Sequence, residues 1–159
     1  MKIEHVLVPL DQSELSEAAL DYAVELIQPH GTITLLWVLS AEMVKPEVHI
    51  RPQPFVEGLQ QKVDKISVWE KAEHYLQTVA SRIHKPGREV RIRIAEGYPA
   101  EQILENASKL GVDAIVMSTH GRSGVSRWVF GSVAQKVLSA AACPVFLVPQ
   151  RSLEHVEAG

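Results

Sequence analysis

Small and hydroxyl-bearing residues are concentrated in one loop near the carboxyl end of the chain. They are Ser118, Thr119, Gly121, Ser123, Gly124, Ser126, Gly131 and Ser132. Glycine lets the backbone approach a ligand without interference from a Cβ atom. Gly131 and Ser132 also precede apolar residues at helical spacing, so we expect them to begin a helix, whose first N–H groups suit an anion. The pattern predicts a phosphate-binding loop, and the phosphates of a nucleotide are its natural ligand.

The charge distribution around this loop favours the same ligand. The whole chain has a formal net charge of -3. Residues 114–153 nevertheless contain no Asp or Glu, while Arg122, Arg127, Lys136 and Arg151 fall among them. A simpler explanation is that a buried strand, a loop and an alanine-rich helix have little room for carboxylates. The glycines and serines of the loop favour the anion site over that explanation.

Apolar runs and helical periodicities predict the elements that hold this loop. The predicted strands are 5–10, 32–39, 88–97, 114–117 and 144–149, and the predicted helices are 11–28, 65–84, 99–110 and 131–142. Because each parallel crossover needs a covering helix, the alternation predicts one α/β domain with a five-stranded, parallel, doubly wound, Rossmann-like sheet and four helices. The domain is predicted to span residues 1–150, and 151–159 to form a frayed tail.

The segment 40–64 interrupts this alternation. Pro46, Pro52, Pro54 and Gly58 favour extended backbone and predict a long loop. A loop of this length serves either as a lid across the ligand or as a surface loop with no ligand role. The sequence favours the surface loop.

Strand 88–97 is predicted to lie at an edge of the sheet. Val90, Ile92 and Ile94 alternate with charged residues, which is typical of a strand with one wet face. Arg91 and Arg93 are therefore interpreted as solvated charges that discourage edge pairing, and not as a nucleic-acid patch.

The sequence lacks several recognisable signals and motifs, and this narrows the classes of function that it supports. The amino-terminal residues lack the long apolar core of a signal peptide, and no run approaches the roughly 18 apolar residues of a membrane span. The single cysteine, Cys143, fits a reducing cytosol, either as a small buried filler or as a redox-reactive thiol. The chain has no Gly-Lys-Ser/Thr phosphate loop, no Gly-x-Ser-x-Gly turn and no metal-ligand cluster. A binding module is therefore favoured over a dedicated enzyme.

Three stretches resemble the universal stress protein family. They are HVLVPLDQSELSEAAL, GYPAEQILENASKLGVDAIVMSTHG, and THGRSG with GSVA and CPVFLVP after it. The ATP-binding branch of that family usually has Gly-x2-Gly-x9-Gly followed by Ser or Thr. Here Gly121 and Gly131 match, and Ser118 replaces the first glycine with a residue whose hydroxyl could donate to a phosphate oxygen. The resemblance implies strand order 3-2-1-4-5, which puts a ligand crevice at the carboxyl ends of the first and fourth strands.

This arrangement, together with the resemblance, assigns roles to the residues that would face the crevice. Val38 and Met117 would sandwich adenine, and magnesium would arrive on the phosphates. Asp11 would either bind adenine or ribose, or serve only as a helix cap. The full predicted nucleotide site is Pro9, Leu10, Asp11, Val38, Met117, Ser118, His120, Gly121, Arg122, Ser123, Gly131, Ser132 and Val133.

The resemblance implies a cytoplasmic, ATP-binding stress-response protein that acts as a nucleotide-dependent binding module or switch. One alternative is a slow ATP hydrolase or autokinase that uses Ser118, Ser123 or Ser132. Another is a stress protein that binds no nucleotide and acts by protein contact. No feature of the sequence identifies client proteins.

The last strand predicts a homodimer. In the order 3-2-1-4-5 it lies at an edge, yet residues 144–149 read PVFLVP with no charge. An apolar edge exposed in a monomer invites aggregation, so we expect a second copy to pair with it. The predicted interface buries Val145, Phe146, Leu147 and Val148.

Overall fold

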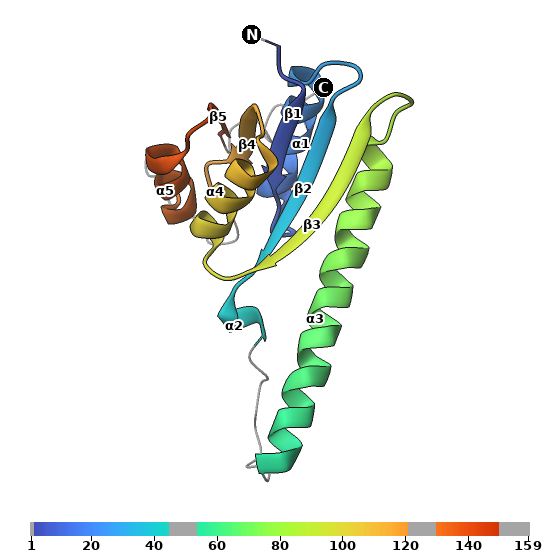
Figure 1. Cartoon of the computed structure of the whole chain (residues 1–159), viewed down its shortest axis with the longest axis vertical. Helices are drawn as coiled ribbons and strands as arrows, with labels where there is room; N and C mark the ends of the chain where they lie inside the picture. Colours follow the sequence, from blue (N-terminus) through green and yellow to red (C-terminus); the bar gives the residue numbers. More distant parts are fainter. Residues whose placement is uncertain (1, 45–53, 121–129, 150–159) are drawn as a thin grey trace.

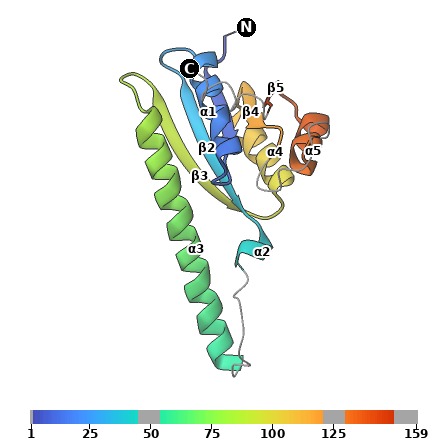
Figure 2. The same ribbon diagram turned by 180° about the vertical axis from the view of Figure 1, so that it is seen from behind.

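The computed structural model describes residues 2–44, 54–120 and 130–149, with side chains described at 2–43, 65–120 and 130–149. A single sheet with helices on both faces forms the body (Figures 1 and 2). Its strands are β1 (His5–Pro9), β2 (Thr32–Leu39), β3 (Glu89–Glu96), β4 (Ala114–Ser118) and β5 (Val145–Val148). All pairings are parallel and the order is β3-β2-β1-β4-β5. The predicted fold class and strand order are confirmed.

Five helices belong to the described residues, one more than predicted. They are α1 (Glu14–Leu26), α2 (Ala41–Val44), α3 (Pro54–Ile83), α4 (Pro99–Leu110) and α5 (Ser132–Ala140). The extra helix is the short α2, which follows β2 directly. Among the described residues, no helix is long and apolar enough to cross a membrane.

Two hydrophobic layers hold the helices against the sheet. Successive residues of a strand point to opposite faces, so Leu35 and Trp37 of β2 pack with α1 and α3, while Leu36 and Val38 pack with α4 and α5. All four side chains are buried, which explains why β2 is a continuous apolar run and not an alternating one. The two ends of β2 match the predicted ends.

The prediction of a long loop at 40–64 is wrong for residues 54–64, which belong to helix α3. Helix α3 begins at Pro54 and not at the predicted Lys65. Proline is tolerated at the first position of a helix, where its missing N–H has no partner in any case. Gly58 lies inside the helix, where glycine costs only about 1 kcal/mol relative to alanine, too little to end a long helix. Residues 45–53, on which much of the lid interpretation depends, lie outside the described part of the chain.

Strand β3 lies at the sheet edge, as predicted, and its only pairing within the described chain is with β2. Arg91 forms an exposed ion pair with Glu89, with 2.7 Å between Nη2 and Oε2.

At the other side of the molecule, Cys143 is half-buried against the layer of α4 and α5. Burial raises the pKa of its thiol, so the reactive thiolate is disfavoured and the filler interpretation of this cysteine is supported.

Tyr75 ties α3 to α1. Its hydroxyl donates to Glu17 Oε1 at 2.7 Å, and Arg82 Nη2 donates to the other carboxylate oxygen at 2.6 Å. Burial, and then the hydrogen bond to Glu17, raise the pKa of Tyr75. The hydroxyl therefore remains a donor throughout the neutral and mildly alkaline range.

We expect Tyr75→Phe to lower the free energy of unfolding by about 1.5–3 kcal/mol, the usual net value of a hydrogen bond to a charged group. Urea denaturation at neutral pH measures this change. Tyr98→Phe is the matched control, because the Tyr98 side chain is 75% exposed. Equal stability of the two variants would show that the hydroxyl of Tyr75 contributes nothing.

Candidate functional site

A cavity of about 280 Å³ lies where β1 and β4 end. These two strands flank the point at which the sheet order reverses, the usual ligand position in an open α/β sheet. Ten predicted site residues line this one cavity: Pro9, Leu10, Asp11, Val38, Met117, Ser118, His120, Gly131, Ser132 and Val133. The other three, Gly121, Arg122 and Ser123, lie outside the described residues.

The floor of the cavity is apolar. Val38 comes from β2 and Met117 from β4, on either side of the end of β1, and both are buried. Ile103 of α4 joins them from the helix layer. The backbone N–H of Leu10 donates to Leu36 O at 2.8 Å, which keeps the chain beside β2 one residue beyond the end of β1. A flat apolar group such as a nucleobase suits these walls.

Asp11 lies in the turn between β1 and α1. The N-cap of α1 is Ser13, whose Oγ accepts from the N–H of Ser16 at 3.0 Å. Asp11 instead accepts from both the N–H and the hydroxyl of Ser13 through Oδ1. The helix-cap interpretation of Asp11 is therefore corrected: this carboxylate orients the capping serine, and it does so at the wall of the cavity.

Gly131 closes the other side of the cavity. Its N–H donates to Thr119 O at 2.8 Å, which joins the two ends of the loop between β4 and α5. Its φ of -55° is open to any residue. Space is what requires glycine here, because a Cβ atom would lie 3.0 Å from Thr119 O. This close approach places the beginning of α5 beside the end of β4.

The beginning of α5 is suited to an anion. Its N-cap residue is Gly131, which has no side chain to cap the first N–H groups, and its first turn contains no acidic residue. Ser132 and Val133, the first two residues of this helix, line the cavity. Uncapped N–H groups and the helix dipole together attract negative charge.

The structure differs from the role expected of the Ser118 hydroxyl. Ser118 is buried, and its hydroxyl donates to His120 O at 2.6 Å. The proton is therefore engaged by the loop itself and is not directed at a phosphate. His120 Nδ1 lies 3.1 Å from Thr119 Oγ1. Its Nε2 is buried and has no hydrogen-bond partner among the described residues.

Sequence reasoning missed some of the lining residues. These are Ser16, Leu36, Met43, Pro99, Ile103 and Ala134. Thr119 also lines the cavity; the sequence had placed it in the phosphate-binding loop but not among the site residues. Leu36 could have been found, because it lies two residues before Val38 on the same face of a strand. Met43 had no such signal, since it reaches the cavity through α2, which was not predicted. No group of His, Cys, Asp and Glu suitable for a metal ion occurs in the described part of the chain.

Fold and cavity together define a doubly wound α/β protein with a ligand crevice at its topological switch point. The universal stress protein family model matches residues 2–149, and the chain belongs to this family. Universal stress protein YxiE of Bacillus subtilis is 30% identical over 149 residues, which cover 90% of this chain and 97% of the relative.

Solved structures agree with the family. The structure of protein MJ0577 of Methanocaldococcus jannaschii has a TM-score of 0.81 and 26% identity, and the match covers 94% of this chain and 98% of the other. A universal stress protein family protein from Arabidopsis thaliana, solved with AMP bound, has a TM-score of 0.60 and 20% identity, with 94% of each chain covered. At that identity the Arabidopsis structure supports the fold alone.

Proposed function

We propose that this chain is an adenine-nucleotide-binding stress protein, with ATP as its ligand, and that the bound nucleotide regulates its contacts with other proteins in the cytoplasm. The observation that carries the proposal is the joining of Gly131 to Thr119, because it brings a helix start with a glycine N-cap next to an apolar crevice. That combination suits a ligand with a flat apolar part and an anionic part. AMP in the Arabidopsis relative is such a ligand.

In this proposal the base lies between Val38 and Met117, the two buried walls. The Asp11 carboxylate accepts from the adenine amino group or the ribose. The phosphates lie at the N–H groups of Ser132 and Val133, and Gly121, Arg122 and Ser123 are proposed to contact them from the loop. Magnesium would be held by phosphate oxygens.

Catalysis by serine is the competing function. The hydroxyl of Ser118 is engaged with His120 O, so it is a poor candidate for an autokinase acceptor. Ser132 is the better one, because it is exposed at the start of α5 and lines the cavity. Mass spectrometry after incubation with ATP and magnesium, with Ser132→Ala as control, separates phosphate transfer from binding alone.

ATP with magnesium is expected to raise the melting temperature. A ligand at about 100 times its dissociation constant adds roughly 2.7 kcal/mol to the stability of the folded state. For a chain of this size that corresponds to about 5–10 °C. Differential scanning fluorimetry measures the shift, and acid extraction of the purified protein followed by chromatography identifies any nucleotide already bound.

Two matched ligands divide this effect into its parts. GTP carries the same phosphates with another base, and adenosine carries the base without phosphates. We expect both to stabilise the protein less than ATP does. If millimolar ATP does not change the melting temperature of protein shown to be free of bound nucleotide, the proposal is wrong. The protein would then be a stress protein that binds no nucleotide.

A further inference from the structure

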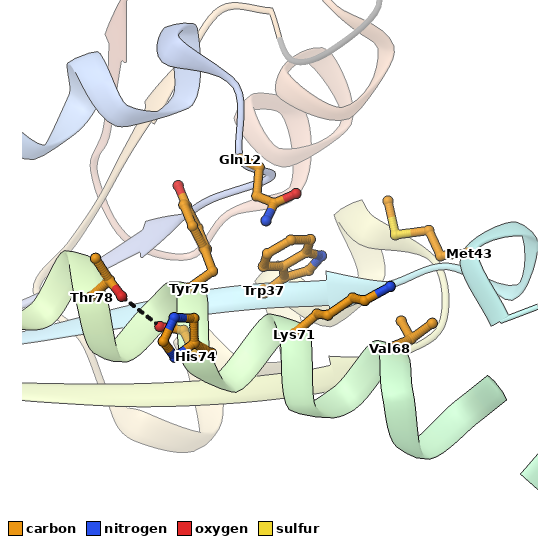
Figure 3. Close-up of a pocket in the computed structure, with 8 residues that line it drawn as sticks. All are labelled: Gln12, Trp37, Met43, Val68, Lys71, His74, Tyr75 and Thr78. Carbon is orange, nitrogen blue, oxygen red and sulfur yellow. Dashed lines mark hydrogen bonds between the residues drawn. The ribbon is translucent and has the colours of Figure 1, made fainter. Parts of the chain in front are cut away.

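A second cavity, of about 560 Å³, lies on the opposite face of the sheet. It is formed between β2 and α3, and Gln12 from the turn after β1 and Met43 from α2 also line it (Figure 3). Trp37 of β2 points into it, whereas Leu36 and Val38, its neighbours along the strand, belong to the layer that contains the nucleotide crevice. The two cavities therefore lie on opposite faces of the sheet, and Met43 of α2 reaches both of them.

Trp37 carries an unpartnered donor at this cavity. The residue is only 5% exposed, and its Nε1 has no hydrogen-bond partner among the described residues. A buried N–H without an acceptor destabilises a fold, because its lost hydrogen bond to water is not replaced. Phenylalanine would fill such a core position without that cost, and the indole nitrogen is covered in the ligand-free protein, so a ligand oxygen would satisfy this N–H by displacing the groups that cover it.

The orientation of the indole is fixed by its neighbours. The rings of Trp37 and Tyr75 meet edge to face, with centroids 5.1 Å apart and an interplanar angle of 88°. Tyr75 is itself held by the hydrogen bond of its hydroxyl to Glu17. The N–H of Trp37 thus belongs to a preorganised wall, which reduces the entropy lost when a ligand binds.

A positive charge lies at the same end of the cavity. Figure 3 shows the Lys71 ammonium and the Trp37 nitrogen directed toward the space between Met43 and Val68. The described residues that line the cavity include no Asp or Glu. Met43 and Val68 add apolar surface around the two donors. The lining therefore complements a molecule with one anionic end and an apolar body.

We propose that this cavity is a second ligand site, specific for small organic anions with a flat apolar body, of which aromatic carboxylates are the simplest class. The Trp37 N–H donates to the carboxylate, and the Lys71 ammonium pairs with it. The ring of the ligand packs against Met43 and Val68. A volume of about 560 Å³ lies within the usual range for small-molecule sites, about 300–1,000 Å³. The proposal does not depend on nucleotide binding at the other crevice.

The test is isothermal titration calorimetry of the full chain with 2-naphthoate and with its neutral counterpart, 2-naphthamide. We expect saturable one-to-one binding of the acid and at least about tenfold weaker binding of the amide, because the amide cannot pair with Lys71. Binding of the acid should persist when ATP is saturating, because the two cavities lie on opposite faces of the sheet, although its affinity can change through Met43, which lines both.

Two variants locate the site. Lys71→Met keeps the aliphatic stem at an exposed helix position, and Trp37→Phe keeps an aromatic ring but removes the N–H. Each is expected to weaken 2-naphthoate binding by about tenfold, the loss of one charge-assisted contact. Lys65→Met is the matched control: it lies on the same helix, pairs with Glu96 and does not line the cavity.

Three results would overturn the proposal. They are no saturable binding of 2-naphthoate to the wild type, equal affinity of the wild type and Lys71→Met, and stoichiometric displacement by ATP. Lys71→Met decides the matter by itself if Trp37→Phe loses stability, because Lys71 is an exposed residue outside the core.

Discussion

Replacing Gly131 by valine is expected to abolish ATP binding and to leave the sheet folded. A Cβ atom at this position would lie 3.0 Å from Thr119 O, and valine adds two further methyl groups. The backbone around Thr119 must give way by at least a few tenths of an ångström. We expect α5 to move away from the end of β4, so that the N–H groups proposed to hold the phosphates no longer lie beside the base. Calorimetry should show at least about a hundredfold loss of affinity, equivalent to about 2.7 kcal/mol.

The fold should survive Gly131→Val because this residue is at a helix start and not in the core. We expect a loss of stability of about 1–2 kcal/mol, within the common range for single substitutions. Gly111→Asn is the matched control. Gly111 has a φ of 59° and open space around it, and asparagine tolerates that conformation. If Gly131→Val binds ATP like the wild type, the phosphates lie elsewhere.

A lysine at Phe146 is expected to convert a dimer into a monomer. We propose that a second copy of the chain pairs with β5, which is an edge strand with half-buried Val145, Phe146 and Leu147. Val148 is only 5% exposed within one subunit, so its predicted contribution to the interface is smaller than expected from the sequence. Phe146 is the better position for the test.

Phe146 also packs against the core of its own subunit, so a control must match that burial. Ile92→Lys provides it, because Ile92 is a half-buried residue of the opposite edge strand and packs against the same cluster. Both lysines should lower the melting temperature, and only Phe146→Lys should halve the mass. Light scattering at tens of micromolar distinguishes these outcomes. If the wild type is a monomer, the proposed dimer does not exist. If Phe146→Lys remains a dimer, the two subunits meet at another surface.

The sheet was predictable because its strands are strongly marked. Residues 32–39 and 114–118 are buried on both faces, so hydrophobic runs define them with almost no ambiguity. The alternation in β3 identified an edge without any knowledge of the partner strands. Helix surfaces were harder to predict: Ile66 and Leu138 follow apolar helical spacing, yet both are exposed. Periodicity indicates a face, but the width of the buried stripe depends on what packs there.

The site was predictable where it consists of strand ends and glycines, as at Asp11, Met117 and Gly131. It was not predictable where tertiary contacts create it. Ser118 was expected to donate to a ligand, and only the folded loop shows that His120 O takes its proton. Trp37 lies in a continuous apolar run and is indistinguishable there from an ordinary core residue. Its unpartnered N–H becomes visible only when α3 and α2 are placed around it.

Met43 lines both cavities, one on each face of the sheet. A ligand that fixes its flexible thioether in one cavity changes the wall presented to the other. Thermodynamic linkage makes any such influence reciprocal: the factor by which ATP alters the affinity for 2-naphthoate must equal the factor by which 2-naphthoate alters the affinity for ATP. Through this one side chain, the affinity of each cavity for its ligand would depend on whether the other cavity is occupied. The protein would thus respond to the combination of two chemically unrelated molecules.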